Sequence, residues 1–185
     1  MQIGGAGLPR CGVHWENEHA GCGKESGIVT TTRLDRVSIF GEQLSFLIPH
    51  EWEESDEDGK NYLYHAPKDR SGWLRVSLIS IKKNCSREEL RSLLDKRAVR
   101  EDGRLFEAGD NLVVAWEKQS QEDGEPITHF WWAVGHYHEP TLSHEAMFSF
   151  TVLTEQKTAS ETVETVALLN QLVAQAEFAP SRPVD

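Results

Sequence analysis

Three histidines at the end of a long apolar stretch are the residues of this chain whose type and spacing could carry chemistry. His136 and His138 are separated by one residue, and His138 and His144 by five residues. In a β-hairpin with a five-residue loop, His138 pairs with His144, and the three imidazoles share one face at the open end of the sheet. Three imidazoles are the ligand set of a zinc site that keeps one position for water. One hypothesis is therefore a zinc-dependent enzyme.

The same histidines also fit a structural role. A chain with 8 histidines readily places three of them near the rim of a sheet, where each is hydrated or bonded to a carbonyl group. The sequence contains no nucleophile elbow, no phosphate-binding loop and no cysteine with a convincing histidine partner. We therefore expect no cofactor and favour a noncatalytic protein, with metal binding by this cluster as the alternative.

The stretch from residue 126 to residue 154 alternates apolar and polar residues and predicts the long β-hairpin that would position these histidines. A register that slipped by one residue would mix its two faces. The register that gives one continuous apolar face pairs Val134 with Phe148, Trp132 with Phe150, and Phe130 with Val152.

The opposite face of this hairpin carries large aromatic residues beside small ones. Ala133 and Gly135 lie between Trp131 and Tyr137. If the helices cover only the other face of the sheet, this row lies in a partly exposed groove, which suits a peptide or helix of a partner. The alternative is that the second helix covers the row. By strand parity and aromatic content, the candidate partner contacts are Trp131, Tyr137, Met147 and Trp116.

The remaining sequence predicts an α+β domain. Short apolar runs predict strands at 37–40, 44–48, 61–65, 73–81, 104–108 and 111–119, and the acidic run at 53–58 predicts a solvated turn. Ser86 with Glu89, and Thr158 with Glu161, have the spacing of capping boxes that open two amphipathic helices. The order predicts a mostly antiparallel sheet with two amphipathic helices packed on it, an α/β/α sandwich.

Composition limits the class of protein and its partners. The 185 residues carry a formal net charge of −11, which disfavours nucleic acid and anionic membrane surfaces. Three cysteines fit a reducing compartment, so we expect a cytoplasmic protein. Residues 1–32 are glycine-rich without periodicity and predict a flexible leader, whose start codon could be misassigned. Residues 33–178 predict a single α+β domain, and residues 179–185 a frayed tail.

Residues 37–178 also follow a recognisable order. A strand beginning at Leu44 ends at Pro49, three residues before Trp52; a strand ending at Trp116, the aromatic hairpin and a terminal amphipathic helix follow. This order resembles the PsbP/Mog-type family of small α/β/α sandwiches, and is most similar to its branch of type VI secretion effector chaperones. The resemblance implies a noncatalytic adaptor or chaperone that holds an apolar peptide or helix, such as part of a secreted effector. A homodimer through the same sheet face is a third interpretation.

Overall fold

The computed structural model describes residues 32–56, 61–67, 72–81, 85–138 and 142–179. The chain divides into two units, residues 1–31 and 32–185, and the fold below is that of the second unit. Residues 1–31 and 180–185 lie outside the described residues. The predictions of a flexible leader and a frayed tail therefore stay predictions.

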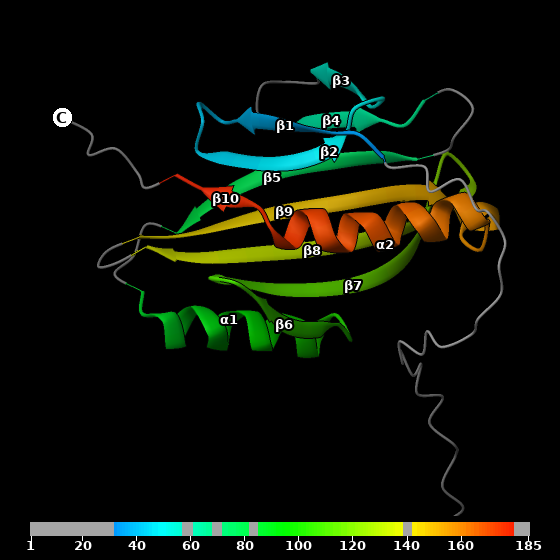
Figure 1. Ribbon diagram of the computed structural model, residues 1–185. Coiled ribbons are helices and arrows are strands. Elements are labelled where there is room, and N and C mark those ends of the chain that lie inside the picture. Colours follow the sequence, from blue (N-terminus) through cyan, green and yellow to red (C-terminus); the bar gives the residue numbers. More distant parts are fainter. Residues whose placement is uncertain (1–31, 57–60, 68–71, 82–84, 139–141, 180–185) are drawn as a thin grey trace, which may run out of the picture. The chain divides into compact units, whose positions relative to one another are not determined.

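A seven-stranded antiparallel sheet forms the centre of this unit (Figure 1). Its strand order is β3–β4–β5–β9–β8–β7–β6, so the hairpin of β8 and β9 is central and β5 pairs with its second strand. The strands are β3 (Glu53–Asp56), β4 (Tyr62–His65), β5 (Trp73–Ile81), β6 (Arg104–Ala108), β7 (Asn111–Glu122), β8 (Glu125–His138) and β9 (Leu142–Leu153).

A smaller sheet and two helices pack on the two faces of this sheet. The small sheet contains β1 (Leu34–Ile39), β2 (Leu44–Pro49) and β10 (Glu177–Phe178). It packs together with α2 (Ser160–Ala174), which follows the short 3-10 helix η1 (Thr154–Gln156), on one face, called here the front face. Helix α1 (Arg87–Arg100) packs on the opposite face, called here the rear face.

The predicted α+β class, with two helices packed on antiparallel sheets, is confirmed. The helices do not cover one face only, which was the condition for the exposed groove, because the central strands bury side chains on both faces. Two groups of buried side chains result. On β8, Trp132 and Val134 belong to the core between the front face and the elements packed on it, called here the front core. Ala133 belongs to the core between the rear face and α1. A strand buried on both sides needs cover on both sides.

Helix α1 begins as the sequence predicts. Ser86 Oγ accepts a hydrogen bond from Glu89 N at 3.2 Å, and Ser86 N donates to Glu89 Oε2 at 2.9 Å, which completes the capping box. Leu90, Leu94 and Ala98 are buried against the sheet. Leu93, which the sequence also places on this face of the helix, is 49% exposed.

Two other local predictions are wrong. The N-cap of α2 is Ala159, which has no side-chain capping bond, so the predicted box of Thr158 and Glu161 does not form. Ser160 instead lies inside the helix and its Oγ donates to Glu164 Oε1 at 2.9 Å. Residues 53–56 of the acidic run form the edge strand β3, which pairs with β4, instead of the predicted turn; residues 57 and 58 lie outside the described residues. Charged side chains are common on edge strands, where they prevent further strand pairing.

The central hairpin forms with a register two residues away from the predicted one. His136, rather than His138, pairs with His144, and Trp132 pairs with Phe148. Pairing continues as far as His138 opposite Leu142, so the connection is shorter than the predicted five residues. A shift of two residues preserves the side-chain face, and therefore the predicted apolar face is correct although its pairs are not.

Among the described residues, no helix is both long and apolar enough to cross a bilayer.

Candidate functional site

Helix α1 is fixed to the rear face by a close approach and an ion pair. A Cβ at Gly135 would lie 2.8 Å from Leu94 Cδ1, so the glycine lets the helix lie against β8. Arg97 forms an ion pair with Glu145 of β9, and its Nη1 also lies 3.0 Å from Met147 Sδ. The Glu145 side chain is 9% exposed and that of Arg97 is 23% exposed, so this pair is shielded from water more than the others on α1.

The four predicted partner contacts lie around this helix. Trp116, Tyr137 and Met147 are half-buried against the α1 core. Trp131 is also half-buried and stacks on Trp116, with ring centroids 5.8 Å apart and an interplanar angle of 7°. The row is therefore partly covered, by the first helix rather than by the second helix that the alternative interpretation invoked. What stays accessible is the part of the rear face beyond α1.

Strands β5, β9 and β8 form this accessible part. On β9, Ser149 lies between Arg75 of β5 and Trp131 of β8 in the sheet register. In the next row, Thr151 lies between Trp73 and His129. Ser149 and Thr151 are each only 4% exposed because their larger neighbours flank them, whereas Trp73 is 37% exposed. The surface of these rows is thus formed by large aromatic and basic side chains.

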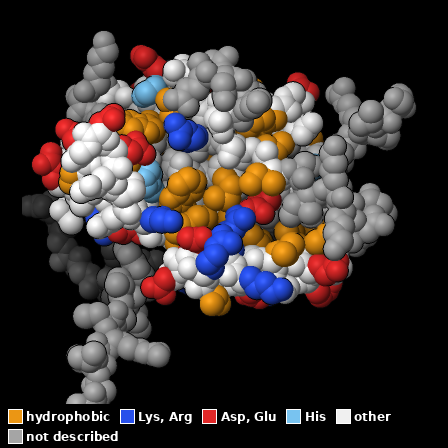
Figure 2. Space-filling model, turned by 180° about the vertical axis from the view of Figure 1, so that it is seen from behind, with side chains coloured by type: hydrophobic (Ala, Val, Ile, Leu, Met, Phe, Trp, Pro, Cys, Tyr) orange, Lys and Arg blue, Asp and Glu red, His pale blue; other side chains and the backbone are white. Residues whose placement is uncertain are grey.

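Apolar side chains extend this surface toward α1. Ile79 of β5 is 45% exposed and pairs with Glu145, the residue that α1 reaches through Arg97. Leu93 precedes Arg97 by one helical turn and so lies on the same side of α1. Figure 2 shows hydrophobic side chains gathered in the middle of this face, with Lys and Arg side chains and some Asp and Glu side chains among and beside them. We call this surface the rear patch; it comprises Trp73, Arg75, Ile79, Leu93, Lys118, His129, Trp131, Met147, Ser149 and Thr151.

His129 of the rear patch is held by hydrogen bonds and lies close to several charged side chains. Its ring nitrogens lie 2.9 Å from Thr151 Oγ1 and 2.9 Å from Ser120 Oγ, so two hydroxyl groups fix the imidazole. Burial is the main cause that lowers the His129 pKa; of the nearby charges Glu122 has the largest effect and raises it, whereas Arg75 and Lys118 lower it. Two cations from different strands therefore act on one point of the patch.

The three predicted metal-site histidines lie together at the opposite end of β8, on the front face. The ring centroids of His136 and His138 are 4.4 Å apart, and those of His138 and His144 are 5.2 Å apart. Phe178 of β10 stacks on His136 and His144 at centroid distances of 5.5 and 6.0 Å. The predicted convergence of the three rings is thus present, in a setting packed by an aromatic side chain.

His136 belongs to a hydrogen-bonded network that holds the end of α2. Its Nδ1 donates to Asn111 Oδ1 at 2.8 Å. The amide nitrogen of Asn111 donates to the backbone oxygens of Ala174 at 3.1 Å and Ala176 at 2.8 Å. Within the described ranges, no group of three or more His, Cys, Asp or Glu side chains is arranged to hold a metal ion. Zinc binding by the cluster stays a prediction, and this geometry gives it no support.

These histidines predict a loss of stability in acid. Burial is the main cause that lowers the pKa values of His136, His138 and His144, and the neighbouring imidazoles lower those of His136 and His144 further. Unfolded histidine, with a pKa near 6.5, then binds protons at a higher pH than the folded chain does. The free energy of unfolding is therefore expected to fall as pH drops below about 6.5, by up to roughly 1.4 kcal/mol per pH unit for each excess proton.

Urea unfolding at pH 7.5 and pH 5.5 tests this expectation. His144→Gln should reduce the loss in acid, because His144 is 1% exposed. His65→Gln is the matched control, since that side chain is exposed. Equal stability of the unsubstituted protein at the two pH values would contradict the account.

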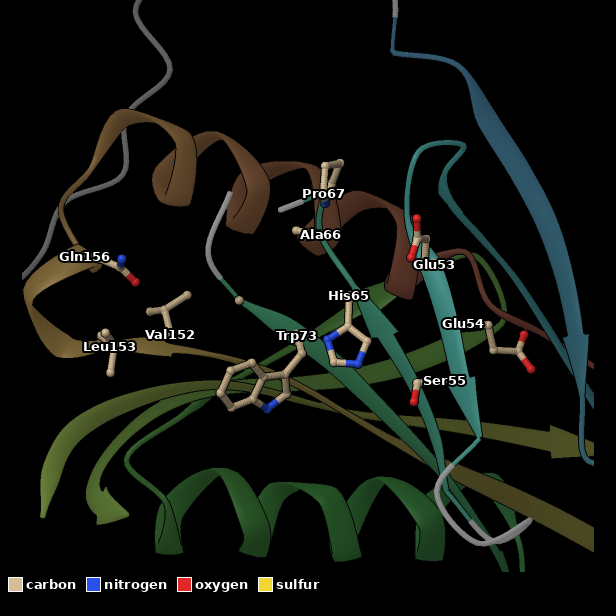
Figure 3. Close-up of a pocket in the computed structure, with 11 residues that line it drawn as sticks. Glu53, Glu54, Ser55, His65, Ala66, Pro67, Trp73, Val152, Leu153 and Gln156 are labelled. Atoms are coloured by element: carbon tan, nitrogen blue, oxygen red, sulfur yellow. The ribbon is translucent and has the colours of Figure 1, made fainter. Parts of the chain in front are cut away.

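A depression of about 660 Å³ lies where β4 ends and β5 begins, at His65 and Trp73 (Figure 3). The rings of His65 and Trp73 lie side by side there, whereas the Glu54 carboxylate points away from them. Trp73 therefore belongs both to this depression and to the rear patch. The lining is Glu53, Glu54, Ser55, His65, Ala66, Pro67, Gly72, Trp73, Val152, Leu153 and Gln156.

Sequence reasoning missed eight of the ten residues of the rear patch. It found Trp131 and Met147 by strand parity, but not Arg75, His129 or Lys118. The alternation of β5 places Trp73, Arg75 and Ile79 on one face, and this was an available signal. What the sequence did not contain is the order of the strands, which places β5 beside β9 rather than at an edge.

No family model and no curated protein matches this chain. Among solved structures, a Bacteroides thetaiotaomicron protein matches with a TM-score of 0.57 and 18% identity, over 79% of this chain and 48% of that one. The chain thus spans about half the length of that protein. LpqN of Mycobacterium tuberculosis, involved in cell envelope biogenesis, matches with a TM-score of 0.52 and 11% identity, over 81% of this chain and 92% of LpqN.

The two proteins behind the sequence resemblance are also among the matching structures. PsbP (CyanoP) of Synechocystis matches with a TM-score of 0.40 and 16% identity, over 85% of this chain and 98% of PsbP. A Mog1 variant matches with a TM-score of 0.45 and 11% identity, over 80% and 97%. Because both TM-scores are below 0.5, we base no conclusion about fold or function on these two matches. The matches with the Bacteroides protein and LpqN show a shared α+β fold and nothing beyond the fold.

Proposed function

We propose that this protein is a noncatalytic binding module that holds an apolar segment of another polypeptide on its rear patch. One observation carries the proposal: two large aliphatic side chains are exposed beside the Arg97–Glu145 ion pair. Ile79, which pairs with Glu145 in the sheet, is 45% exposed, and Leu93, one helical turn before Arg97, is 49% exposed. Large apolar side chains that gather on an exposed face favour a protein contact. The neighbouring Trp131 has the residue type that most often dominates binding energy.

The partner class follows from the sequence resemblance. We propose a cytoplasmic adaptor or chaperone whose partner is a secreted effector, with type VI secretion as the system that the resemblance implies. The stacked pair of Trp116 and Trp131 supports such a role, because rigid aromatic side chains bind at a low cost in conformational entropy. A second copy of this chain on the same surface is the competing occupant.

Charge substitutions at the two exposed aliphatic residues test the proposed function. Ile79→Glu or Leu93→Glu places a carboxylate in the contact surface, so each is expected to weaken partner binding by about 10-fold or more, equivalent to roughly 1.4 kcal/mol. Affinity purification from the source cells should recover the same polypeptide with the unsubstituted protein, and little of it with either variant.

Val163→Glu is the matched control, because Val163 is 52% exposed on α2 and lies on the front side of the sheet. Thermal melts of the three variants should stay close to that of the unsubstituted protein, since each changed side chain is already exposed. Equal recovery with all three variants would contradict a binding role for the rear patch. Loss of self-association alone would identify the contact as a homodimer interface.

A further inference from the structure

We propose that this chain forms a symmetric dimer in which one edge of β7 pairs with the same edge of a second copy. Strand β7 is longer than the neighbour on its outer side, because β6 pairs with it only as far as Ala115, and Figure 1 shows β7 running on past β6. Among the described residues, 116–122 pair with β8 alone, and we call them the free edge. The proposal does not depend on partner binding by the rear patch.

The turn at the end of β7 shows which backbone groups face outward. Asp123 and Gly124 join β7 to β8, and their φ angles of 50° and 85° are both positive, as a type I′ hairpin turn requires. The residues that flank such a turn, here Glu122 and Glu125, form the hydrogen-bonded pair that closes the hairpin. Because backbone groups alternate along a strand, every second residue before Glu122 turns its N–H and C=O away from β8.

The outward-facing residues of the free edge are therefore Glu117, Gln119 and Gln121. Pro126 agrees with this alternation, because it lies opposite Gln121 and has no N–H to donate to β7. The side chains of residues 117–122 are all exposed. The free edge thus offers accessible backbone donors and acceptors to which a further strand can bind.

The side chains of the free edge complement those of a second copy in one antiparallel register. With Ser120 opposite Ser120 of the second copy, Lys118 lies opposite Glu122 of the second copy, and the reverse pair forms by symmetry. Gln119 then lies opposite Gln121 of the second copy, so outward-facing residues meet and exchange backbone hydrogen bonds. A two-fold axis at Ser120 therefore gives a closed dimer with an ion pair on each side of the axis.

Other registers lose this complementarity. Centring the pairing on Gln119 or Gln121 places no opposite charges across from each other. Centring it on Lys118 or Glu122 places like charges across from each other. Charged side chains on an edge usually oppose strand pairing, whereas the pattern of this edge selects a single arrangement of two identical strands.

One like-charged contact in the preferred register is already compensated. Glu117 lies opposite Asp123 of the second copy, but Lys157 Nζ lies 2.6 Å from Glu117 Oε1, so that carboxylate is paired within its own chain. The strands paired over residues 118–122 span about 17 Å. The interface is therefore small, and we expect a weak dimer that dissociates on dilution.

Sedimentation velocity at protein concentrations of about 5 to 500 µM tests for this dimer. Lys118→Glu and Glu122→Lys each turn both ion pairs into like-charge contacts, so each should weaken self-association by about 10-fold or more. An equimolar mixture of the two variants should form dimers again, because both contacts between unlike chains then join opposite charges.

Two further variants locate the interface. Lys96→Glu is the matched control, because Lys96 is exposed on α1 and its replacement changes the net charge as Lys118→Glu does. That variant should self-associate as the unsubstituted protein does. Gln119→Pro removes an outward-facing N–H and spares the pairing with β8, so it should abolish the dimer. Thermal melts should show that each variant is folded; if Gln119→Pro is not, the mixture of charge variants decides.

The outcomes separate this interface from the rear patch. An unsubstituted protein that stays monomeric over the whole range, or a mixture of Lys118→Glu and Glu122→Lys that does, would overturn the proposed dimer. Self-association lost in Ile79→Glu but kept in Lys118→Glu would place the contact on the rear patch and would also overturn it. Loss of partner capture by Ile79→Glu with an unchanged dimer would support both proposals.

Discussion

Replacing Trp132 by alanine is expected to lower the free energy of unfolding by about 3–5 kcal/mol. Trp132 is 1% exposed and lies in the front core, where it pairs with Phe148 across the central hairpin. Its Nε1 donates to Asn170 Oδ1 of α2 at 2.7 Å, so the substitution removes both packing and the hydrogen bond that ties the helix to the sheet. Urea unfolding at pH 7.5 measures the change.

Two further variants separate these contributions. Trp132→Phe keeps most of the apolar area and removes the bond to Asn170, so a loss of about 1 kcal/mol is expected. Trp73→Ala is the matched control for the residue type, because Trp73 is 37% exposed on the rear face, and its replacement should cost clearly less than that of Trp132. A larger loss for Trp73→Ala than for Trp132→Ala would show that the front core has been misplaced.

Removing the ion pair that holds α1 is expected to have the second-largest effect. Glu145→Ala leaves the Arg97 guanidinium without its carboxylate in a site where the two side chains are only 23% and 9% exposed. Breaking a buried pair by removing one partner costs about 3–5 kcal/mol, and the partial exposure of Arg97 lowers the expected loss to about 2–3 kcal/mol. Hydrogen exchange should show faster opening of the buried turns of α1 at Leu90, Leu94 and Ala98.

A second ion pair on the same helix provides the comparison. Arg91 pairs with Glu107 of β6, and these side chains are 48% and 51% exposed. Glu107→Ala is expected to cost no more than about 1 kcal/mol, because exposed pairs are weak and screened by salt. Similar losses for Glu145→Ala and Glu107→Ala, or no change in exchange from α1, would contradict the role given to the Arg97–Glu145 pair.

The elements of this fold could be read from the sequence where the local signal is strong. The alternation in the hairpin predicts its apolar face, and the spacing of Ser86 and Glu89 predicts the start of α1. The register of the hairpin could not be derived in the same way. A slip of two residues keeps the same faces, so the pattern alone does not distinguish His138 from His136 as the partner of His144.

The periodicity of the sequence does not predict how elements distant in the chain pack together. Amphipathicity indicates that α1 and α2 each have an apolar side, but not which face of the sheet each one covers. Asn111 contacts Ala174 and Ala176, which are 63 and 65 residues further along the chain, and nothing in its neighbourhood indicates those partners. The two-residue strand β10 is likewise too short to give a pattern.

The candidate site was predictable to a similar extent. Parity placed Trp131 and Met147 on the face that α1 only partly covers. The cations Arg75 and Lys118 become part of the same surface only through the order of β5, β9, β8 and β7 in the sheet. The histidine cluster illustrates the reverse case, since its convergence was predicted but the stacking of Phe178 on its rings was not.

Site-specific photo-crosslinking inside the source cells tests the central claim most directly. A photoreactive amino acid replaces Ile79 in one variant and Val163 in another, because both side chains are similarly exposed, at 45% and 52%. We predict a crosslink from position 79 to an apolar segment of one other polypeptide, and no such product from position 163. The same polypeptide captured from both positions, or from position 163 alone, would contradict a binding site on the rear patch.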